Sequence, residues 1–172
     1  MSEGIRIYGD AVLRKKSKAF DLPEELPSVV NLLNRLFYVL DKAEGIGLAA
    51  PQIGESFRLF VALPGHLEEL QGHTVFVNPI VQPYGDLEKK EEGCLSIPGI
   101  YETFFRPERA RITAFNEKGL QFTLDLGGLA ARLVQHETDH LDGILFVDKL
   151  SSIKKKLLKR KLKNLLNENI AE

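Results

Sequence analysis

The chain has 172 residues, a formal net charge of −1 and a hydrophobic content of 44%, which indicate one ordinary globular domain over residues 1–172. The small net charge gives no case for binding DNA or any other nucleic acid through the molecule as a whole. No apolar run of 18 residues and no signal-peptide pattern are present, so no membrane association is expected. The single cysteine cannot form an internal disulfide, which suits a reducing compartment such as the cytoplasm.

Helical and strand-like patterns alternate along the first three quarters of the chain, which predicts the α+β class. Apolar residues at helical spacing predict a long N-terminal helix over residues 27–44 that ends at Gly45. Apolar runs predict four strands, and residues 116–119 are typical of a hairpin turn between the last two. The predicted strands are residues 57–63, 75–77, 111–115 and 120–126.

A second helix is predicted after Gly127 and Gly128. Four residues follow one helical stripe at i, i+4, i+7 and i+11, and Gly143 is a suitable C-terminal stop. We expect this stripe to face the interior, with mixed or antiparallel strands around the helix. The stripe consists of Leu129, Leu133, His136 and His140.

The C-terminal segment, residues 152–172, is predicted to be a basic amphipathic helix. Its apolar stripe comprises Ile153, Leu157, Leu158, Leu162, Leu165 and Leu166. Its basic residues are Lys154, Lys155, Lys156, Lys159, Arg160, Lys161 and Lys163. Two interpretations stay open: a solvated basic face over a docking stripe, or a surface that contacts RNA.

The central helix carries the sequence His-Glu-x-x-His. His136 and His140 lie four residues apart, so their imidazoles can converge on one metal ion, and Glu137 can handle a proton of a metal-bound water. This combination favours a hydrolase. The alternative is a pair of histidines that are merely satisfied polar groups on a helix face.

Cys94 is the best candidate for a third metal ligand, because a thiolate binds borderline and soft divalent ions well. It follows the charged residues 88–92 and is expected to end a strand or open a turn, although a buried cysteine without chemistry is the simpler alternative. No histidine follows His140, so the spaced pattern of many zinc proteases is not continued. His66 and His73, in an expected loop, are weaker candidates.

Glycines flank Ile46 in the segment Gly45-Ile46-Gly47. Such a backbone can approach another chain closely, and an extended substrate could pair with it by strand addition. A plain loop at the end of a helix is the alternative. A phosphate-binding loop is disfavoured, because the Lys-Ser/Thr pair that such a loop requires is missing.

Three segments, at residues 45–52, 92–96 and 135–141, together resemble the motifs of bacterial-type peptide deformylases, in the family's order. They are Gly-Ile-Gly-Leu-Ala-Ala-Pro-Gln, Glu-Gly-Cys-Leu-Ser and Gln-His-Glu-Thr-Asp-His-Leu. The resemblance spans nearly the whole chain. It implies an enzyme that removes the N-formyl group from the initiator methionine of new polypeptides and releases formate.

The resemblance also implies roles for individual residues. Cys94, His136 and His140 would be the metal ligands, and Glu137 would be the general base and acid. The Gln52 amide and the Leu95 backbone N–H would bind the formyl oxygen as charge develops on it. Ile46, Gly47, Leu129 and Leu133 are the candidates for contacting the substrate methionine.

The resemblance further implies one divalent ion, Fe(II) in the cell, with zinc or nickel able to replace it. The partners would be N-formylmethionyl nascent peptides, and the C-terminal helix could contact the ribosome near the exit tunnel. Two positions depart from a simple pattern. Arg132 is expected at the rim of the substrate pocket or extending to solvent, and Tyr101 stands where some relatives have an arginine.

Two other functions compete with deformylation. A zinc endopeptidase would cut internal peptide bonds and needs a third ligand downstream of His140, which the sequence does not offer. A metal-binding module without catalysis, which only docks on ribosomes, would need damage at Glu137, Gln52 or Cys94, and all three residues are intact.

Overall fold

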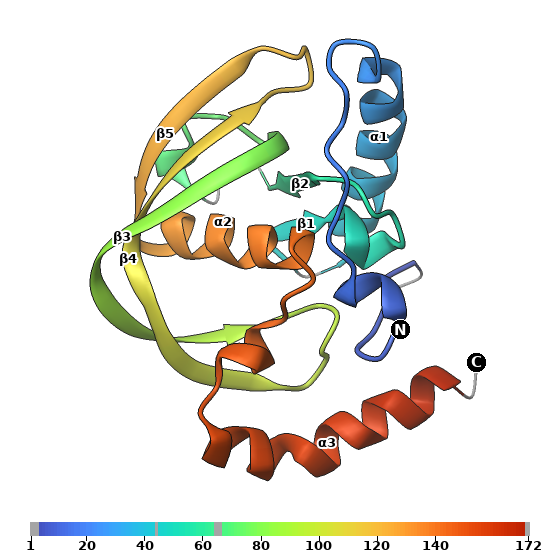
Figure 1. The fold of residues 1–172 in the computed structure, drawn as a ribbon, viewed down its shortest axis with the longest axis vertical. Coiled ribbons are helices and arrows are strands. Elements are labelled where there is room, and N and C mark those ends of the chain that lie inside the picture. Colours follow the sequence, from blue (N-terminus) through green and yellow to red (C-terminus); the bar gives the residue numbers. More distant parts are fainter. Residues whose placement is uncertain (1–3, 44, 64–66, 171–172) are drawn as a thin grey trace.

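A five-stranded antiparallel sheet curves around one central helix in the computed structural model, which describes residues 4–43, 45–63 and 67–170 (Figure 1). The spatial order of the strands follows the sequence, from β1 to β5. The strands are β1 (Gly47–Ala49), β2 (Leu59–Ala62), β3 (Val75–Gly93), β4 (Tyr101–Phe115) and β5 (Gln121–Gly127). The helices are α1 (Leu26–Lys42), α2 (Gly128–Leu141) and α3 (Ser152–Ile170). The predicted α+β class and its three helices are therefore confirmed.

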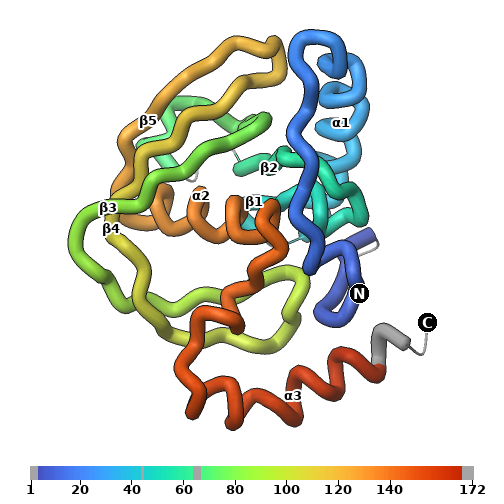
Figure 2. The backbone as a smooth tube through the Cα atoms, in the orientation of Figure 1, coloured from blue at the N-terminus to red at the C-terminus, as the bar shows by residue number. Residues whose placement is uncertain are grey.

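The β3–β4 pair forms a long bent ribbon, and α2 lies across its concave side (Figures 1 and 2). The pairing runs from Val77 opposite Phe115 to Gly93 opposite Tyr101, with two register shifts along the way. Such irregularities bend a strand pair. The ribbon carries the chain around the end of α2 and delivers Cys94, the residue after β3, to the side of that helix.

The short strands β1 and β2 separate two parts of the core. On β2, Leu59 and Val61 pack with α1, whereas Phe60 and Ala62 pack with α2. Successive side chains of a strand point to opposite faces, so this strand must be apolar throughout. Its two apolar faces hold α1 and α2 on opposite sides of the sheet.

The predicted strands are present, but several bounds were wrong. The run 75–77 is only the start of β3, which continues to Gly93, and β4 begins ten residues before the predicted residue 111. Most side chains of the ribbon's outer part are exposed, so hydrophobic alternation gives little signal there. The predicted N-terminal helix is α1, although residue 44 lies outside the described residues.

Two predictions about α2 need correction. Leu129 does not face the interior, since 51% of its surface is exposed in the first turn of the helix. Arg132 neither extends to solvent nor lies at a rim, because only 5% of it is exposed and its guanidinium is held by buried partners. Leu133, His136 and His140 are buried as predicted, and α2 ends before Gly143.

The C-terminal helix α3 docks through fewer residues than its sequence stripe indicates. Leu158 is buried, and Leu162 and Leu165 are partly buried against a cluster that includes Phe104 and Phe146. Ile153 and Leu157, predicted to belong to the stripe, are 72% and 76% exposed. Among the described residues, no helix is long and apolar enough to cross a membrane.

Candidate active site

Cys94, His136 and His140 converge at one point beside α2. One potential ligand atom from each residue lies within 4.8 Å of the other two, and the Cys94 Sγ is 3.2 Å from the His140 Nε2. The histidines occupy adjacent turns of α2, so their rings share a face. Cys94 arrives from the end of β3, where its carbonyl accepts a hydrogen bond from the Ile97 N–H and closes a turn. The predicted turn at Cys94 is therefore confirmed.

The donor set fits a borderline or soft divalent metal. One sulfur and two imidazole nitrogens suit zinc, iron(II) or nickel rather than magnesium or calcium. Two buried polar atoms of the neighbourhood, Glu137 Oε2 and His140 Nδ1, have no hydrogen-bond partner in the described part of the chain. Burying a polar atom without a hydrogen-bond partner costs free energy. The Glu137 Oε2, which has no such partner among the described residues, is therefore consistent with a site that binds a ligand.

Glu92 fixes the orientation of His136. Its Oε2 lies 3.0 Å from the His136 Nδ1, which leaves the Nε2 of that ring for a metal. Arg106 donates to both carboxylate oxygens, at 2.6 Å and 2.9 Å, and Arg132 donates to Oε1 at 2.6 Å. Arg106 also reaches Asp139 at 2.7 Å. A carboxylate held by two guanidinium groups is a rigid partner for the imidazole.

The electrostatics of the metal-free site follow from burial and from these contacts. Burial lowers the pKa of His140 well below its ordinary value, so this ring is neutral and can donate a lone pair. Burial also lowers the pKa of His136, but hydrogen bonds to Cys94 and Glu92 outweigh it and raise the pKa well above the ordinary value. A divalent cation at the same point would replace the proton of that imidazolium.

Glu137 is a buried acid with a perturbed pKa. Burial raises the pKa of its carboxyl to about 7, because the charged form loses hydration. A carboxyl group that titrates near neutral pH can both accept and return a proton. Its Oε1 lies against the backbone of Gly47, where a Cβ atom would come within 2.8 Å of it. The glycine is therefore required for this carboxylate position.

Gln52 is held in a fixed orientation beside Cys94. Its Oε1 accepts a hydrogen bond from the Ala49 N–H at 2.8 Å, so its amide NH₂ faces the other way. That group lies 3.7 Å from the Cys94 Sγ and donates to the Ser96 Oγ at 3.3 Å. The short 3₁₀ helix Ala50–Ile53, which is fully buried, positions this side chain.

A cavity of about 510 Å³ opens next to these residues. The predicted substrate-contacting residues Ile46, Gly47, Leu129 and Leu133 all line it, together with Gln52, Cys94, Leu95, His136 and Glu137. Tyr101 also lines it and is 66% exposed. The structure thus brings the three sequence motifs together around one opening.

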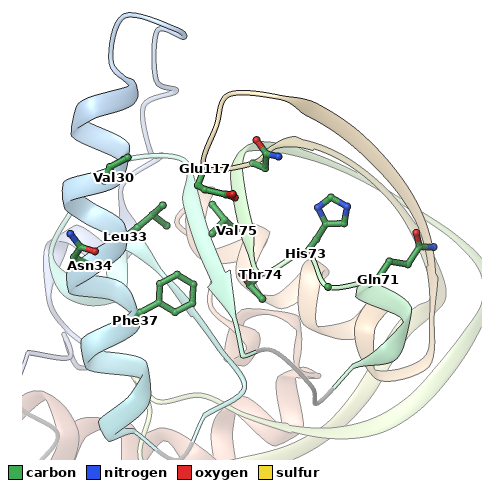
Figure 3. A pocket seen from close by; sticks show the side chains of 11 residues that line it. Val30, Leu33, Asn34, Phe37, Gln71, His73, Thr74, Val75 and Glu117 are labelled. Atoms are coloured by element: carbon green, nitrogen blue, oxygen red, sulfur yellow. The ribbon is translucent and has the colours of Figure 1, made fainter.

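A second cavity of about 480 Å³ contains none of the residues predicted for catalysis, for the Cys-His-His metal site or for substrate contact. It lies between α1 and the start of β3 and is lined by Leu33, Phe37, His73 and Glu117, among others (Figure 3). His73, one of the weaker ligand candidates, stacks on Phe122 and is not part of the metal cluster. His66 lies outside the described residues. The two cavities have similar volumes, so chemistry rather than size distinguishes the candidate active site.

The sequence matches the family model described as polypeptide deformylase over residues 2–156. The chain belongs to the peptide deformylase family. A peptide deformylase of Christiangramia forsetii is 42% identical over 171 residues, which cover 92% of this chain and 86% of the relative. One of Salinibacter ruber is 39% identical, covering 96% of this chain and 89% of the relative.

Solved structures of deformylases share the fold. The crystal structure of peptide deformylase from Thermus thermophilus superposes with a TM-score of 0.83 at 38% identity, covering 98% of this chain and 99% of that one. A Plasmodium falciparum peptide deformylase in complex with an inhibitor gives a TM-score of 0.80 at 32% identity, covering 98% and 99%. This deformylase is a metal-dependent hydrolase that removes the N-formyl group from newly synthesised polypeptides.

Sequence reasoning missed two residues of the deformylase site. Glu92 stands in the charged run before Cys94 and begins the second motif, but the sequence assigns it no role of its own, and Arg106 is not singled out. Their side chains are 6% and 4% exposed. The available signal was position, because Glu92 lies two residues before Cys94, within the second motif.

Proposed function

We propose that Cys94, His136 and His140 hold one divalent ion and that Glu137 is the general base and acid of deformylation. The observation that supports this assignment is the convergence of one sulfur and two imidazoles within 4.8 Å, beside a buried Glu137 oxygen that has no hydrogen-bond partner in the described part of the chain. When bound, the ion lowers the pKa of a coordinated water and polarises the formyl group.

Glu137 performs the proton transfers in this proposal. Its Oε2 accepts the proton of the attacking water and delivers it to the leaving amine of the methionine. A pKa of about 7 suits both steps near neutral pH. Burial of this carboxyl also keeps bulk water from competing for the proton.

Gln52 and Leu95 stabilise the negative charge that develops on the formyl oxygen. The amide NH₂ of Gln52 is turned towards Cys94 because its oxygen is occupied by Ala49. We assign the second donor to the Leu95 backbone N–H, since Leu95 lines the same cavity next to Cys94. Loss of one such donor typically costs about 3 kcal/mol of transition-state stabilisation.

The methionine side chain occupies the apolar part of the cavity, against Ile46, Leu129 and Leu133. The substrate backbone pairs with the segment at Gly47, because β1 is an edge strand bonded only to β2 in the described sheet. The half-exposed Leu129 stands at the opening, where an extended peptide would leave. These contacts explain why a peptide substrate enters the cavity with its N-terminus first.

Fe(II) is our proposed metal in the cell, with zinc or nickel as replacements in preparations. Thiolate donation from Cys94 makes the ion a milder Lewis acid than neutral ligands would. The direct test is formate release from a short formyl-methionyl peptide by protein purified without oxygen, with the metal quantified in the same sample. Release proportional to bound iron, with the unformylated peptide left intact, is expected. Internal cleavage of longer peptides would instead indicate an endopeptidase.

We also propose that the enzyme works in the cytoplasm and contacts the ribosome through α3. Lys154 is not available for this contact, because its ammonium binds Glu102 and Thr103. Other basic residues of α3 are exposed, and such clusters bind phosphate backbones in a salt-dependent way. The exposed basic residues are Lys155, Lys156, Lys159, Arg160, Lys161 and Lys163.

A charge-matched pair of variants tests the ribosome contact. Lys155, Lys159 and Lys163 are replaced together by Gln in one protein. Exposed Lys15, Lys16 and Lys118, outside α3, are replaced by Gln in the other. We expect only the first protein to lose co-sedimentation with ribosomes at low salt. Equal co-sedimentation of both proteins with ribosomes would exclude α3 as the ribosome contact.

A further inference from the structure

Arg132 is a buried cation that the proposed chemistry does not use. It lies on α2 about one turn before His136 and lines the active-site cavity, yet its side chain is only 6% exposed. A charged group in an apolar substrate pocket is costly unless its donors are satisfied. Its contacts show where those donors go.

The Arg132 guanidinium binds the β3–β4 ribbon at several points. It donates to the Glu92 carboxylate at 2.6 Å and to the backbone carbonyl of Glu88 at 2.9 Å. Longer contacts reach the carbonyls of Phe104 at 3.4 Å and Lys90 at 3.5 Å. The planar guanidinium presents several donors in a fixed geometry, so one side chain ties α2 to both strands of the ribbon.

These contacts join the two elements that carry the proposed metal ligands. Cys94 follows β3, whereas His136 and His140 belong to α2, and a metal site requires their donor atoms at fixed separations. Glu92 is the shared partner, since it receives Arg132 on Oε1 and faces the His136 Nδ1 with Oε2. The distance between β3 and α2 and the ring orientation of His136 thus both depend on the Arg132 guanidinium.

We infer that Arg132 is a positioning residue, which braces β3 against α2 and holds Glu92 on His136 so that Cys94, His136 and His140 meet at one ion. This inference rests on the proposed metal ligands. Arg106 binds Glu92 from β4 and Asp139 on α2, but it touches no backbone carbonyl of β3 among the described contacts. The two arginines therefore have different tasks.

The test compares two variants of Arg132. Arg132→Met keeps the length and the apolar stem, whereas Arg132→Lys keeps the charge but not the planar, forked set of N–H donors. Arg111→Met is the control, because Arg111 lies on β4 in an exposed pair with Asp125. Affinity for Co²⁺ and the absorption bands of the bound ion are measured on metal-free protein, together with kcat, KM and the unfolding temperature.

Loss of a partner that orients a ligand typically lowers metal affinity 10- to 100-fold. We expect a loss of about this size in folded Arg132→Met with altered Co²⁺ bands, a smaller loss in Arg132→Lys, and wild-type values in Arg111→Met. Wild-type affinity and bands in folded Arg132→Met, with only KM or the unfolding temperature changed, would overturn the inference. If the Met variant does not fold, wild-type Co²⁺ affinity in Arg132→Lys overturns it.

The proposed ligand set is tested separately in the same assay. Cys94→Ser must change the Co²⁺ bands if the thiolate is a ligand. Unchanged bands in that variant would refute the ligand assignment itself, whatever Arg132→Met shows. Changed bands in Cys94→Ser with unaltered Arg132 variants would refute only the bracing role.

Discussion

The Gly47 backbone and the Glu137 carboxylate are in such close contact that no other residue fits at position 47 without movement. A Cβ atom there would lie 2.8 Å from the Glu137 Oε1 and 2.7 Å from the Leu133 Cδ1. Real Cβ atoms do not approach other atoms so closely. The glycine of the first motif thus sets the position of the proposed base in the third.

Substitution of Gly47 by Ala should therefore impair catalysis rather than folding. The added methyl group displaces the Glu137 carboxylate, and a shift of about 1 Å in a catalytic group can cost on the order of 100-fold in rate. We expect kcat for formate release to fall at least tenfold while bound metal is retained. Gly127→Ala is the matched control, since no heavy atom of the described residues lies within 4 Å of its Cβ position and its φ is −128°. Equal activities of the two variants would contradict the proposed dependence of the Glu137 carboxylate position on Gly47.

Replacement of Glu137 by Ala should separate metal binding from turnover. The side chain is not among the proposed ligands, so metal content should stay at the wild-type level. Removal of a general base typically costs 100- to 10,000-fold in rate, and we expect a loss of about that size in formate release. Metal analysis and activity are measured on the same sample. An active variant would exclude Glu137 as the base.

Cys94→Ser should change the metal rather than the fold. Cys94 is only partly buried and makes no disulfide, and serine has nearly the same shape. A serine hydroxyl is a poor ligand for soft and borderline ions, so the variant should lose bound metal or retain it with lower affinity. Metal content after dialysis against a weak chelator is the measurement, and the unfolding curve is the control. Full metal retention would mean that another residue is the third ligand.

The motifs predicted which side chains converge, Cys94, His136 and His140, more accurately than periodicity predicted the bounds of the strands. His136 and His140 are linked by helical geometry alone, so their convergence follows from local sequence. Cys94 was the best third ligand by thiolate chemistry and by the lack of a histidine after His140, and the family resemblance then named it, although nothing local shows that β3 ends beside α2. The length of β3 was not predictable from alternation, since the exposed ribbon has no single buried face. Arg132 was misjudged for a related reason: its partners Glu88, Glu92 and Phe104 lie 28 to 44 residues away in the sequence.

The Glu92 network should make the metal-free protein sensitive to acid. Burial raises the pKa of Glu92, but hydrogen bonds from His136 and Arg106 outweigh it and lower the pKa to about 2. Because the folded-state pKa lies below the unfolded value, the stabilisation is complete above about pH 4.5 and is lost as pH falls towards 2. A shift of this size corresponds to roughly 3 kcal/mol.

Glu92→Gln provides the measurement of this dependence. The variant should be less stable than wild type at pH 7, because it removes the carboxylate that Arg106 and Arg132 share and leaves the buried Arg132 without an acidic partner among the described contacts. The difference in unfolding free energy between the two proteins should shrink as pH falls from 4.5 towards 2, since wild-type Glu92 becomes neutral there too. Urea titrations of both metal-free proteins at a series of pH values give this difference. A difference that is constant with pH would exclude Glu92 as its source.

Docking of α3 should depend on Leu158 and not on its sequence neighbour Leu157. Leu158 is 6% exposed and packs in the cluster that contains Phe104 and Phe146, whereas Leu157 is 76% exposed. Truncation of a buried leucine removes apolar contacts and leaves a cavity, so Leu158→Ala should cost about 2 kcal/mol of unfolding free energy. Leu157→Ala, with the same change in helix propensity, should stay within about 0.5 kcal/mol of wild type. Denaturant unfolding of both variants tests this, and similar losses would mean that α3 docks through the other face.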